Sequence, residues 1–264
     1  KLKKLILNIY IYIIVSLMDS VLILNTNINV TSVEEVTNLL QKRDAKTIAV
    51  CNTNTLVRSY KDSELQNKIN AFDIKVPDGF PVAKASNILY KNEQKRVDGY
   101  NIFHKTLKKG LENNLSHYFF GSDELIIKKL KSELLKKYPN LIILGHTCPP
   151  YLNYKELVKS EYVDDLIEKK PDIVWVSLGF PKQEEFIDLL LKNNNLISNF
   201  AAVGAVFEWS AGTKIKAPEI LANIGLEWIF RLIQEPRRLY KRYFVDNFLF
   251  IIYIIKQIRK TNDR

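Results

Sequence analysis

Short apolar runs alternate with amphipathic stretches along the chain from about residue 27 onward. The runs are rich in β-branched and aromatic residues and predict strands, whereas the stretches between them repeat with the period of a helix. The predicted strands are Thr47–Val50, His117–Phe120, Leu141–Leu144, Asp172–Leu178 and Phe200–Val203, and the predicted helices include Asp123–Lys137, Lys155–Lys169 and Lys182–Lys192. This alternation predicts an α/β fold with a mainly parallel sheet and helices on both faces. Ligands of such sheets bind in the loops at the carboxyl ends of the strands.

The beginning of the chain does not follow this pattern. Lys1–Leu17 is rich in Lys, Ile, Asn and Tyr, and the only methionine is Met18. We interpret residues 1–18 as an extension that either does not belong to the natural protein or touches a membrane, and a cleaved signal sequence is a third alternative. Its apolar run is interrupted by Asn8 and Ser16 and is too short to span a bilayer.

The composition changes again near Gly225. Residues 228–264 contain nine Lys or Arg against three Asp or Glu, so about six of the +10 net charge lies there. The run Phe248–Ile255 is apolar but too short to cross a bilayer. A basic, aromatic and apolar segment predicts an interfacial membrane anchor, with a terminal helix packed on the core as the alternative. The predicted organisation is a core of residues 19–225 and a basic, amphipathic appendage of residues 226–264.

The net charge of +10 requires an anionic partner, which can be nucleic acid, anionic lipid or a phosphorylated substrate. A nucleic-acid-binding protein would interleave basic and aromatic residues across one face of its main domain. Here the excess charge is concentrated in the apolar tail. We therefore expect contact with lipid and none with nucleic acid.

Several cofactor and metal motifs are missing. No glycines have the GxG spacing of a dinucleotide site, and neither a P-loop nor a GxSxG elbow occurs. Cys51 and Cys148 imply no disulfide framework, and the three histidines lack zinc-site spacing. Asp-x-Asp, which binds diphosphates through a cation in many sugar transferases, is also absent. We expect no cofactor and no metal. If the chain is a transferase, its leaving diphosphate must be neutralised by cationic side chains and backbone amides.

Five segments carry candidate chemistry. Val76-Pro-Asp-Gly-Phe-Pro places an aspartate after a predicted strand, although Pro-Asp-Gly alone is ordinary turn chemistry. In Val174–Glu184, Pro181 opens a helix whose free amides, with Lys182 and Gln183, would suit an anion. The other three are the basic turn Lys95-Arg-Val-Asp-Gly-Tyr-Asn, the glycine turn Ala202-Val-Gly-Ala-Val-Phe-Glu and the arginine-rich Gly225–Tyr243.

In this order and spacing the segments resemble the WecG/TagA/CpsF family of bacterial glycosyltransferases, glycosyltransferase family 26. The resemblance extends from about Asn27 to Phe250. Its most specific pieces are Gly-x-Pro-Lys-Gln-Glu at Gly179–Glu184, Val-Gly-Ala-x-Phe at Val203–Phe207, Ala217-Pro218, and the tail Gly-Leu-Glu-Trp with Glu-Pro-Arg-Arg.

The resemblance implies a Rossmann-like α/β domain with a helical, membrane-associating C-terminal appendage. It implies an inverting, metal-independent enzyme that moves a hexosamine-type sugar, N-acetylmannosamine or a related one, from a UDP donor. The acceptor would be a sugar on undecaprenyl diphosphate, in the synthesis of teichoic acid or another cell-surface polysaccharide. The expected partners are the UDP-sugar, the polyprenyl-diphosphate-linked acceptor and the membrane surface, at the cytoplasmic, inner face of the cell membrane. A homo-oligomer is left open.

The resemblance also implies roles for individual residues. Asp78 matches the aspartate expected to act as general base. The implied donor-binding residues are Asn52, Thr53, Arg96, Gly179, Lys182, Gln183 and Gly204, and the implied acceptor-diphosphate residues are Arg231, Arg238, Lys241 and Arg242. The spacing of Arg231, Arg238 and Arg242 predicts that they share one face of a helix, with Phe244, Phe248 and Ile252 turned toward lipid.

Three departures from the family pattern concern the donor. Asn101 stands where many relatives carry aspartate, Lys216 precedes Ala217-Pro218 where arginine is common, and His146-Thr-Cys-Pro-Pro-Tyr replaces a His-Gly-Tyr-Phe type of turn. Transfer of glucose, galactose or N-acetylmannosaminuronic acid in capsular polysaccharide synthesis is therefore an alternative, and a non-catalytic lipid-binding protein is a second one.

Overall fold

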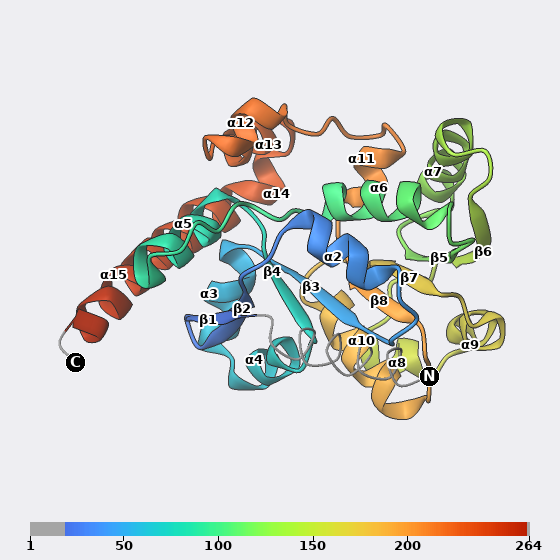
Figure 1. Ribbon diagram of the computed structural model, residues 1–264, viewed down its shortest axis with the longest axis horizontal. Coiled ribbons are helices and arrows are strands. Elements are labelled where there is room, and N and C mark those ends of the chain that lie inside the picture. Colours follow the sequence, from blue (N-terminus) through green and yellow to red (C-terminus); the bar gives the residue numbers. More distant parts are fainter. Residues whose placement is uncertain (1–18, 263–264) are drawn as a thin grey trace, which may run out of the picture.

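The computed structural model describes residues 19–262 (Figure 1). The N-terminal extension expected at residues 1–18 lies outside the described residues, as do residues 263–264 and the side chains of Arg242 and Asn262. Inside them is a six-stranded sheet in the order β4-β3-β8-β7-β5-β6, in which every neighbouring pair of strands is parallel. The strands are β3 (Thr47–Cys51), β4 (Ile74–Pro77), β5 (Ser116–Gly121), β6 (Ile142–Thr147), β7 (Ile173–Ser177) and β8 (Asn199–Ala202). The predicted α/β class and parallel sheet are confirmed.

A separate antiparallel hairpin precedes the sheet and was not expected from the sequence. It pairs β1 (Ser20–Ile23) with β2 (Thr26–Asn29). Leu24 and Asn25 form its tight turn with φ of 48° and 60°. Side chains alternate in burial along β1, which is the period of a half-buried strand.

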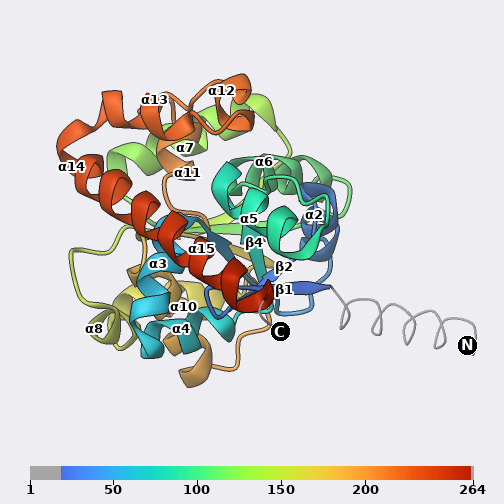
Figure 2. The ribbon, with the colours of Figure 1, turned by 90° about the vertical axis from the view of Figure 1, so that its left-hand side faces the viewer.

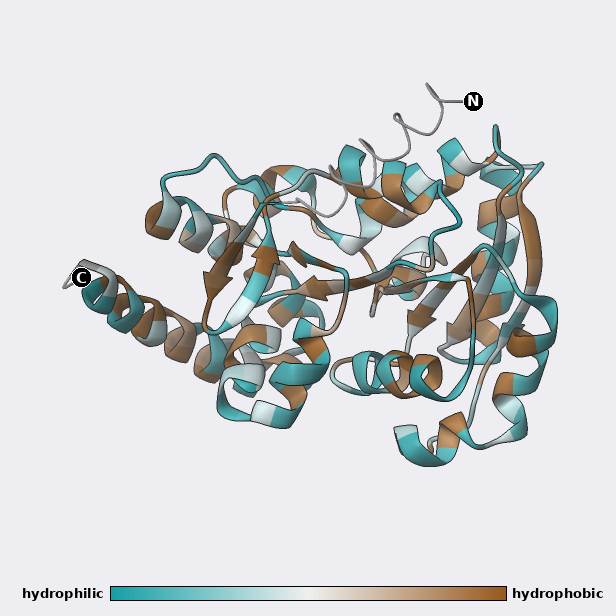
Figure 3. Cartoon of the chain, turned by 60° about the horizontal axis from the view of Figure 1, so that its bottom comes forward, coloured by the Kyte–Doolittle hydropathy of each residue, from teal (hydrophilic) through white to brown (hydrophobic). Residues whose placement is uncertain are grey.

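The sheet is buried on both faces. Along β7, Ile173 and Trp175 pack into one hydrophobic cluster, whereas Val174 and Val176 pack into the other, because successive side chains of a strand point to opposite faces. One cluster includes side chains of the helices α2 (Val33–Leu40), α6 (Gly99–Gly110), α7 (Glu124–Lys137) and α11 (Val206–Ser210). The other includes side chains of α3 (Thr53–Lys61), α4 (Ser63–Asn70), α5 (Phe80–Tyr90), α8 (Tyr154–Val158), α9 (Asp164–Lys169) and α10 (Lys182–Asn193). Figure 3 shows largely apolar strands between helices in which hydrophobic and hydrophilic residues alternate along the ribbon.

The prediction of a single helix over Lys155–Lys169 is wrong. The chain forms α8, a short 3-10 turn η1 (Glu161–Val163) and α9 instead. Ser160 adopts an extended conformation with φ −92° and ψ 161°, and its hydroxyl donates to the Leu157 carbonyl at 2.7 Å. Serine hydroxyls compete with the helical hydrogen-bond ladder in this way, which ends α8 early.

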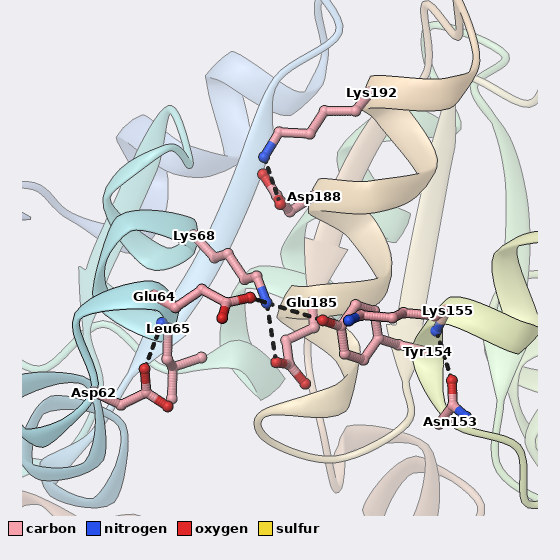
Figure 4. Close-up of polar contacts among 10 residues, drawn as sticks. All are labelled: Asp62, Glu64, Leu65, Lys68, Asn153, Tyr154, Lys155, Glu185, Asp188 and Lys192. Carbon is pink, nitrogen blue, oxygen red and sulfur yellow. Dashed lines mark hydrogen bonds and ion pairs between the residues drawn. The ribbon is translucent and has the colours of Figure 1, made fainter.

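Helix α10, which begins beside the candidate site, is fixed to its neighbours by one lysine (Figure 4). Lys68 on α4 lies 3.2 Å from a Glu185 carboxylate oxygen on α10 and donates to the Tyr154 hydroxyl of α8 at 3.1 Å. A third contact joins Lys68 to Glu64 on its own helix at 2.7 Å. Because the Lys68 and Glu185 side chains are only 12% and 20% exposed, their ion pair is partly shielded from solvent and helps to hold α10 in a defined position.

The C-terminal appendage is helical, as expected, but it is not one helix. It follows the short helix α12 (Glu219–Asn223) and comprises α13 (Glu227–Gln234), α14 (Pro236–Lys241), the π-helical segment η2 (Arg242–Asp246) and α15 (Asn247–Asn262). Glu235 leaves the helical conformation with φ −134° and ψ 59° immediately before Pro236, which cannot continue the hydrogen-bond ladder of α13. Arg231 and Arg238 therefore lie on different helices, and the prediction of one shared helical face is wrong.

Helix α15 packs against the main body (Figure 2). Phe250 and Ile254 are 3% and 7% exposed and belong to the core cluster that also contains residues of α3. The rings of Tyr60 on α3 and Tyr253 on α15 have centroids 5.0 Å apart. Gln257 joins the β1–β2 hairpin, since its amide nitrogen donates to the Leu22 carbonyl at 2.7 Å. Within residues 19–262, no helix has both the length and the apolar character needed to cross a bilayer.

Candidate active site

Two adjoining cavities open at the carboxyl ends of β3, β4, β7 and β8, next to the appendage. Their volumes are about 190 Å³ and about 70 Å³. Asn52, Asp78 and Arg231 line both of them. Of the residues predicted from the sequence, the larger cavity also brings together Arg96, Gly179, Gln183, Gly204 and Arg238, and the smaller one adds Thr53.

Asp78 is positioned by the end of β4. Its backbone N–H donates to the Cys51 carbonyl at 2.8 Å, which continues the pairing of β4 with β3 by one residue. The next residue, Gly79, has φ +86° and ψ 145°, a conformation that strains any residue with a Cβ, and α5 begins directly after it. The Pro-Asp-Gly sequence thus turns the chain sharply at the carboxyl-terminal edge of the sheet. The Asp78 side chain lies at this edge and is 24% exposed.

Arg96 lies among three carboxylates, one of which is Asp78. Its guanidinium lies 2.7 Å from Glu227, 3.7 Å from Asp78 and 3.8 Å from Asp98, and its side chain is only 9% exposed. The loop that carries Arg96 is fixed to the end of β4, because the Val97 N–H donates to the Pro77 carbonyl at 3.0 Å. The cluster therefore contains one buried cation and three anions, with further positive charge nearby.

Burial raises the pKa of Asp78 to about 6. The Arg96 guanidinium opposes this rise in pKa, whereas the carboxylates of Glu227 and Asp98 add to it, and Arg231 opposes it in turn. A carboxyl with a pKa of about 6 is ionised at neutral pH and is a stronger proton acceptor than an ordinary aspartate. Asp78 thus has the position and the protonation behaviour of a general base.

Asp98 is a site residue that sequence reasoning missed, although it lies inside the quoted Arg-Val-Asp-Gly segment. Its side chain caps α6 by accepting from the Asn101 N–H at 3.2 Å, and the Asn101 amide donates a second bond at 2.6 Å. An ionised aspartate at position 101 could not donate that bond, so the departure at Asn101 has a local structural effect. Lys216, the second departure, lies 3.7 Å from the Asp98 carboxylate and 4.1 Å from the centroid of the Tyr100 ring.

Gln183 joins the turns that follow β7 and β8. Its side-chain oxygen accepts from the Gly204 N–H at 3.1 Å, and its amide nitrogen donates to Glu184 at 2.9 Å. Its backbone N–H donates to the Gly179 carbonyl at 3.0 Å. The Gln183 backbone amide is therefore already paired and is not one of the free amides expected at this helix start, although α10 begins only at Lys182. A contact of Gln183 with the donor stays a prediction.

Glu184 was also missed, and it lines the larger cavity as a buried acid that is 1% exposed. Burial raises its pKa to about 8, against the hydrogen bond from Gln183, which lowers the pKa. Glu184 is therefore largely protonated at neutral pH. Two of the acids that line this cavity thus have separated protonation states, with Asp78 ionised and Glu184 neutral.

Of the three predicted acceptor cations whose side chains the structure describes, Arg231 and Arg238 line the larger cavity. The Arg231 guanidinium lies 5.1 Å from the Trp209 ring centroid, and Arg238 pairs with Glu235 at 2.6 Å. Lys241 is exposed and lies outside both cavities, and the side chain of Arg242 is not described. Lys182, predicted to bind the donor, lines neither cavity and places its ammonium 5.1 Å from the centroid of the Tyr151 ring.

The residues predicted for the first loop connect the site to the appendage. The Asn52 side chain caps α3 by accepting from the N–H groups of Asn54 and Thr55 at 3.1 and 3.2 Å. The Thr53 hydroxyl donates to the Asn247 side chain at 2.6 Å, at the start of α15. Trp228 and Tyr243 complete the wall of the smaller cavity from the appendage side. Sequence spacing could not reveal the contact between Thr53 and Asn247, since it joins segments far apart in the chain.

A parallel α/β sheet with a carboxyl of raised pKa and several guanidinium groups around one cavity is an arrangement suited to a group-transfer enzyme. The chain belongs to the glycosyl transferase WecG/TagA/CpsF family, whose sequence model matches residues 21–264. It is a glycosyltransferase, as its resemblance to this family implied.

The chain is similar to named transferases of Bacillus and Staphylococcus. An N-acetylglucosaminyldiphosphoundecaprenol N-acetyl-beta-D-mannosaminyltransferase of Bacillus subtilis strain 168 is 27% identical over 193 residues, which cover 72% of each chain. The enzymes of the same name from Bacillus spizizenii and Staphylococcus aureus strain MW2 are 26% and 30% identical. Those alignments cover 76% and 65% of each chain, respectively.

Proposed function

We propose that this protein transfers N-acetylmannosamine, or a closely related hexosamine, from a UDP donor to a sugar carried on undecaprenyl diphosphate. The names of the relatives support the sugar and the lipid-linked acceptor. The observation that carries the chemistry is Asp78, an aspartate with a pKa of about 6 that lines both cavities together with Arg231. Such a site serves a synthetic pathway of a cell-surface polymer such as teichoic acid.

The proposed reaction is a single displacement. The Asp78 carboxylate takes the proton of the acceptor hydroxyl while that oxygen attacks the anomeric carbon of the donor. The bond between this carbon and the phosphate oxygen of UDP breaks as the new glycosidic bond forms, so the configuration inverts. The departing diphosphate gains negative charge on its oxygens, which Arg231 and Arg238 stabilise from the appendage side of the larger cavity.

The alternative donors remain within the same mechanism. The departures at Asn101 and Lys216 surround Asp98 rather than Asp78. Substitutions at these two positions would alter the contacts of the cavity rim with the donor sugar and would leave Asp78 in place. The donor screen described below therefore includes glucose, galactose and N-acetylmannosaminuronic acid as well as N-acetylmannosamine. A non-catalytic lipid-binding role would not require a base of raised pKa beside two cavity-lining arginines.

The proposed acceptor and the appendage support a peripheral position at the inner face of the membrane. Phe244, Phe248, Ile251 and Ile255 are 52%, 63%, 56% and 45% exposed, and their spacing places them on one side of η2 and α15. Ile252, which was expected on this side, is half-buried. An α-helix has about 3.6 residues per turn, so each step of four residues rotates the position slightly around the helix, and Ile251 occupies the exposed side instead of Ile252. We call the four exposed residues the apolar stripe. Lys256, Arg259 and Lys260 add positive charge at the end of α15, which suits anionic lipid.

The test is a donor screen with purified protein. UDP-N-acetylmannosamine, UDP-N-acetylmannosaminuronic acid, UDP-N-acetylglucosamine, UDP-glucose and UDP-galactose are each offered with a lipid-diphosphate-N-acetylglucosamine analogue, and the product is detected by mass spectrometry. We expect the first donor to give the highest kcat/KM. Asp78→Asn is the matched control for background hydrolysis. Transfer from none of the five donors by a protein that binds the lipid analogue would favour the non-catalytic alternative.

A further inference from the structure

Glu124, His146 and Cys148 lie together outside both cavities, at the carboxyl ends of β5 and β6. One ligand atom of each residue lies within 4.8 Å of the others. The His146 Nε2 and a Glu124 carboxylate oxygen are 3.5 Å apart. In a tetrahedral zinc site, bonds of about 2.0–2.3 Å place ligand atoms roughly 3.3–3.8 Å from one another. The imidazole and carboxylate are thus already at a ligand-to-ligand distance.

The fold prepares this arrangement from two adjacent strands. β5 and β6 pair in parallel, with Phe119 opposite His146 and Phe120 opposite Thr147. The two strands therefore end side by side, so that the residue after Thr147 faces the loop after β5. In that loop Asp123 caps α7 by accepting from the Ile126 N–H at 2.9 Å, which makes Glu124 the first residue of the helix. Strand pairing and a helix cap fix the backbone of all three residues.

We propose that Glu124, His146 and Cys148 bind a borderline-soft divalent cation, Zn²⁺, with three protein ligands. Imidazole nitrogen, thiolate sulfur and carboxylate oxygen are the donors that zinc uses in proteins. One thiolate and one carboxylate balance the charge of the cation, and the thiol proton is released to solvent when the metal binds. The Glu124 side chain is 73% exposed, so it can rotate to close the set, and the solvent side leaves a fourth position for water.

The bound cation would join the β5–α7 loop to the β6–α8 loop. Neither cavity of the candidate active site is lined by these three residues. The role we assign to the cation is therefore to stabilise the loops at this end of the sheet, and the transfer step does not use it. The sequence did not reveal the site, because Glu124 is distant in the chain from the His-x-Cys pair and no paired spacing results.

Cobalt is the spectroscopic probe for this site. Tag-free, full-length protein is treated with a chelator, exchanged into chelator-free buffer and titrated with Co²⁺. We expect a thiolate-to-cobalt charge-transfer band that saturates at one equivalent and is removed by added Zn²⁺. Cys148→Ser and His146→Gln should lose the band. Cys51→Ala is the matched control for the other cysteine, which is fully buried in β3, and it should keep the band.

Thermal unfolding supplies the second measurement. Zn²⁺ at a hundredfold excess over its Kd should raise the Tm of the wild-type protein by about 5–10 °C and leave the Tm of Cys148→Ser unchanged. Circular dichroism verifies that Cys148→Ser and His146→Gln are folded. A titration without a saturating band, or a band of equal intensity in Cys148→Ser, would overturn the proposal. Neither measurement depends on transfer activity, so it is independent of the proposed function.

Discussion

The guanidinium of Arg96 lies 2.7 Å from the Glu227 carboxylate, and this ion pair connects the loop beside the base to the first turn of α13. The same guanidinium lies 3.7 Å from Asp78. One side chain thus links the candidate base, the main body and the appendage. The appendage belongs to the electrostatic environment of the site, because Glu227 and Arg231 both influence the pKa of Asp78.

Asp78→Asn should lower kcat by about two to four orders of magnitude, the usual contribution of a positioned base. An asparagine of the same shape keeps the cavity but cannot take up the acceptor proton. In the wild type, kcat/KM should rise with pH through about 6 and then level off, because only the ionised carboxylate is active. Steady-state kinetics between pH 5 and 8 measure both effects. Activity of Asp78→Asn within a few-fold of the wild type would remove Asp78 from this role.

The same substitution should stabilise the fold at neutral pH. The pKa of Asp78 is raised from 3.8 to about 6, so the folded protein binds this proton more tightly than the unfolded chain does. Ionisation of Asp78 therefore lowers the free energy of unfolding. This decrease takes place as the pH rises from about 4 to about 6 and persists at higher pH. Asparagine does not ionise. Asp78→Asn should raise the free energy of unfolding by about 1–3 kcal/mol at pH 7.5. The upper figure corresponds to the whole rise in the pKa of Asp78, and the lower one allows for solvent screening of this partly exposed carboxylate.

Denaturant titrations at two pH values test this prediction. The difference between Asp78→Asn and the wild type should shrink toward zero below pH 4, where both side chains are neutral. An equal or lower stability of the variant at pH 7.5 would contradict the raised pKa.

Glu227→Gln should move the acidic limb of the pH–rate profile to lower pH. The Glu227 carboxylate raises the pKa of Asp78, and glutamine removes that negative charge while keeping the shape. The base would then stay ionised at more acidic pH. Arg96→Lys keeps the charge and provides the comparison, since it should disturb the 2.7 Å contact with Glu227 while leaving a cation in the cluster. A limb that moves to higher pH in Glu227→Gln would show that the carboxylate does not act on Asp78 through its charge.

Much of this site could be predicted from the sequence, because the residues that carry it follow strands. The apolar runs before Asn52, Asp78, Gly179 and Gly204 locate the four loops, and parallel strands bring those loops to one edge. The pair between Arg96 and Glu227 could not be predicted in this way, because it depends on how the appendage folds back. The break at Glu235 was a detectable signal, since Pro236 stands inside the segment that we treated as one helix.

The transfer step should survive excess EDTA, because arginines rather than a cation are proposed to neutralise the departing diphosphate. Arg231→Gln should then reduce kcat/KM by about 10–100-fold, the equivalent of one lost charge-assisted hydrogen bond of about 1.5–3 kcal/mol. Arg237→Gln is the matched control, because Arg237 is exposed on α14 and lines neither cavity. It should stay within about twofold of the wild type.

Enzyme assays in EDTA with and without added Mg²⁺ or Mn²⁺ separate the two mechanisms. Loss of all transfer in EDTA that Mg²⁺ or Mn²⁺ restores would contradict diphosphate neutralisation by arginine. The assay is repeated with Cys148→Ser, so that removal of a structural zinc ion is distinguished from removal of a catalytic cation.

The apolar stripe on η2 and α15 should determine binding to lipid. Phe248→Ser and Ile251→Ser together remove two side chains that are 63% and 56% exposed, so the fold should lose little stability. Binding to vesicles that contain anionic phospholipid should fall by about 10–100-fold, because each large apolar side chain contributes about 1.5–3 kcal/mol when it is fully buried and less at an interface. Vesicle co-sedimentation measures the binding, and thermal unfolding verifies the fold.

Phe250→Ser is the contrasting variant, since Phe250 is 3% exposed and packs into the core cluster beside α3. It should lower the free energy of unfolding by about 3–5 kcal/mol and should affect lipid binding only through unfolding. Transfer to a water-soluble acceptor analogue distinguishes anchoring from catalysis. Phe248→Ser with Ile251→Ser should transfer to this analogue at the wild-type rate, because the stripe lines neither cavity and Arg231 and Arg238 remain in place. Equal vesicle binding by the double variant and the wild type would show that another surface contacts the membrane.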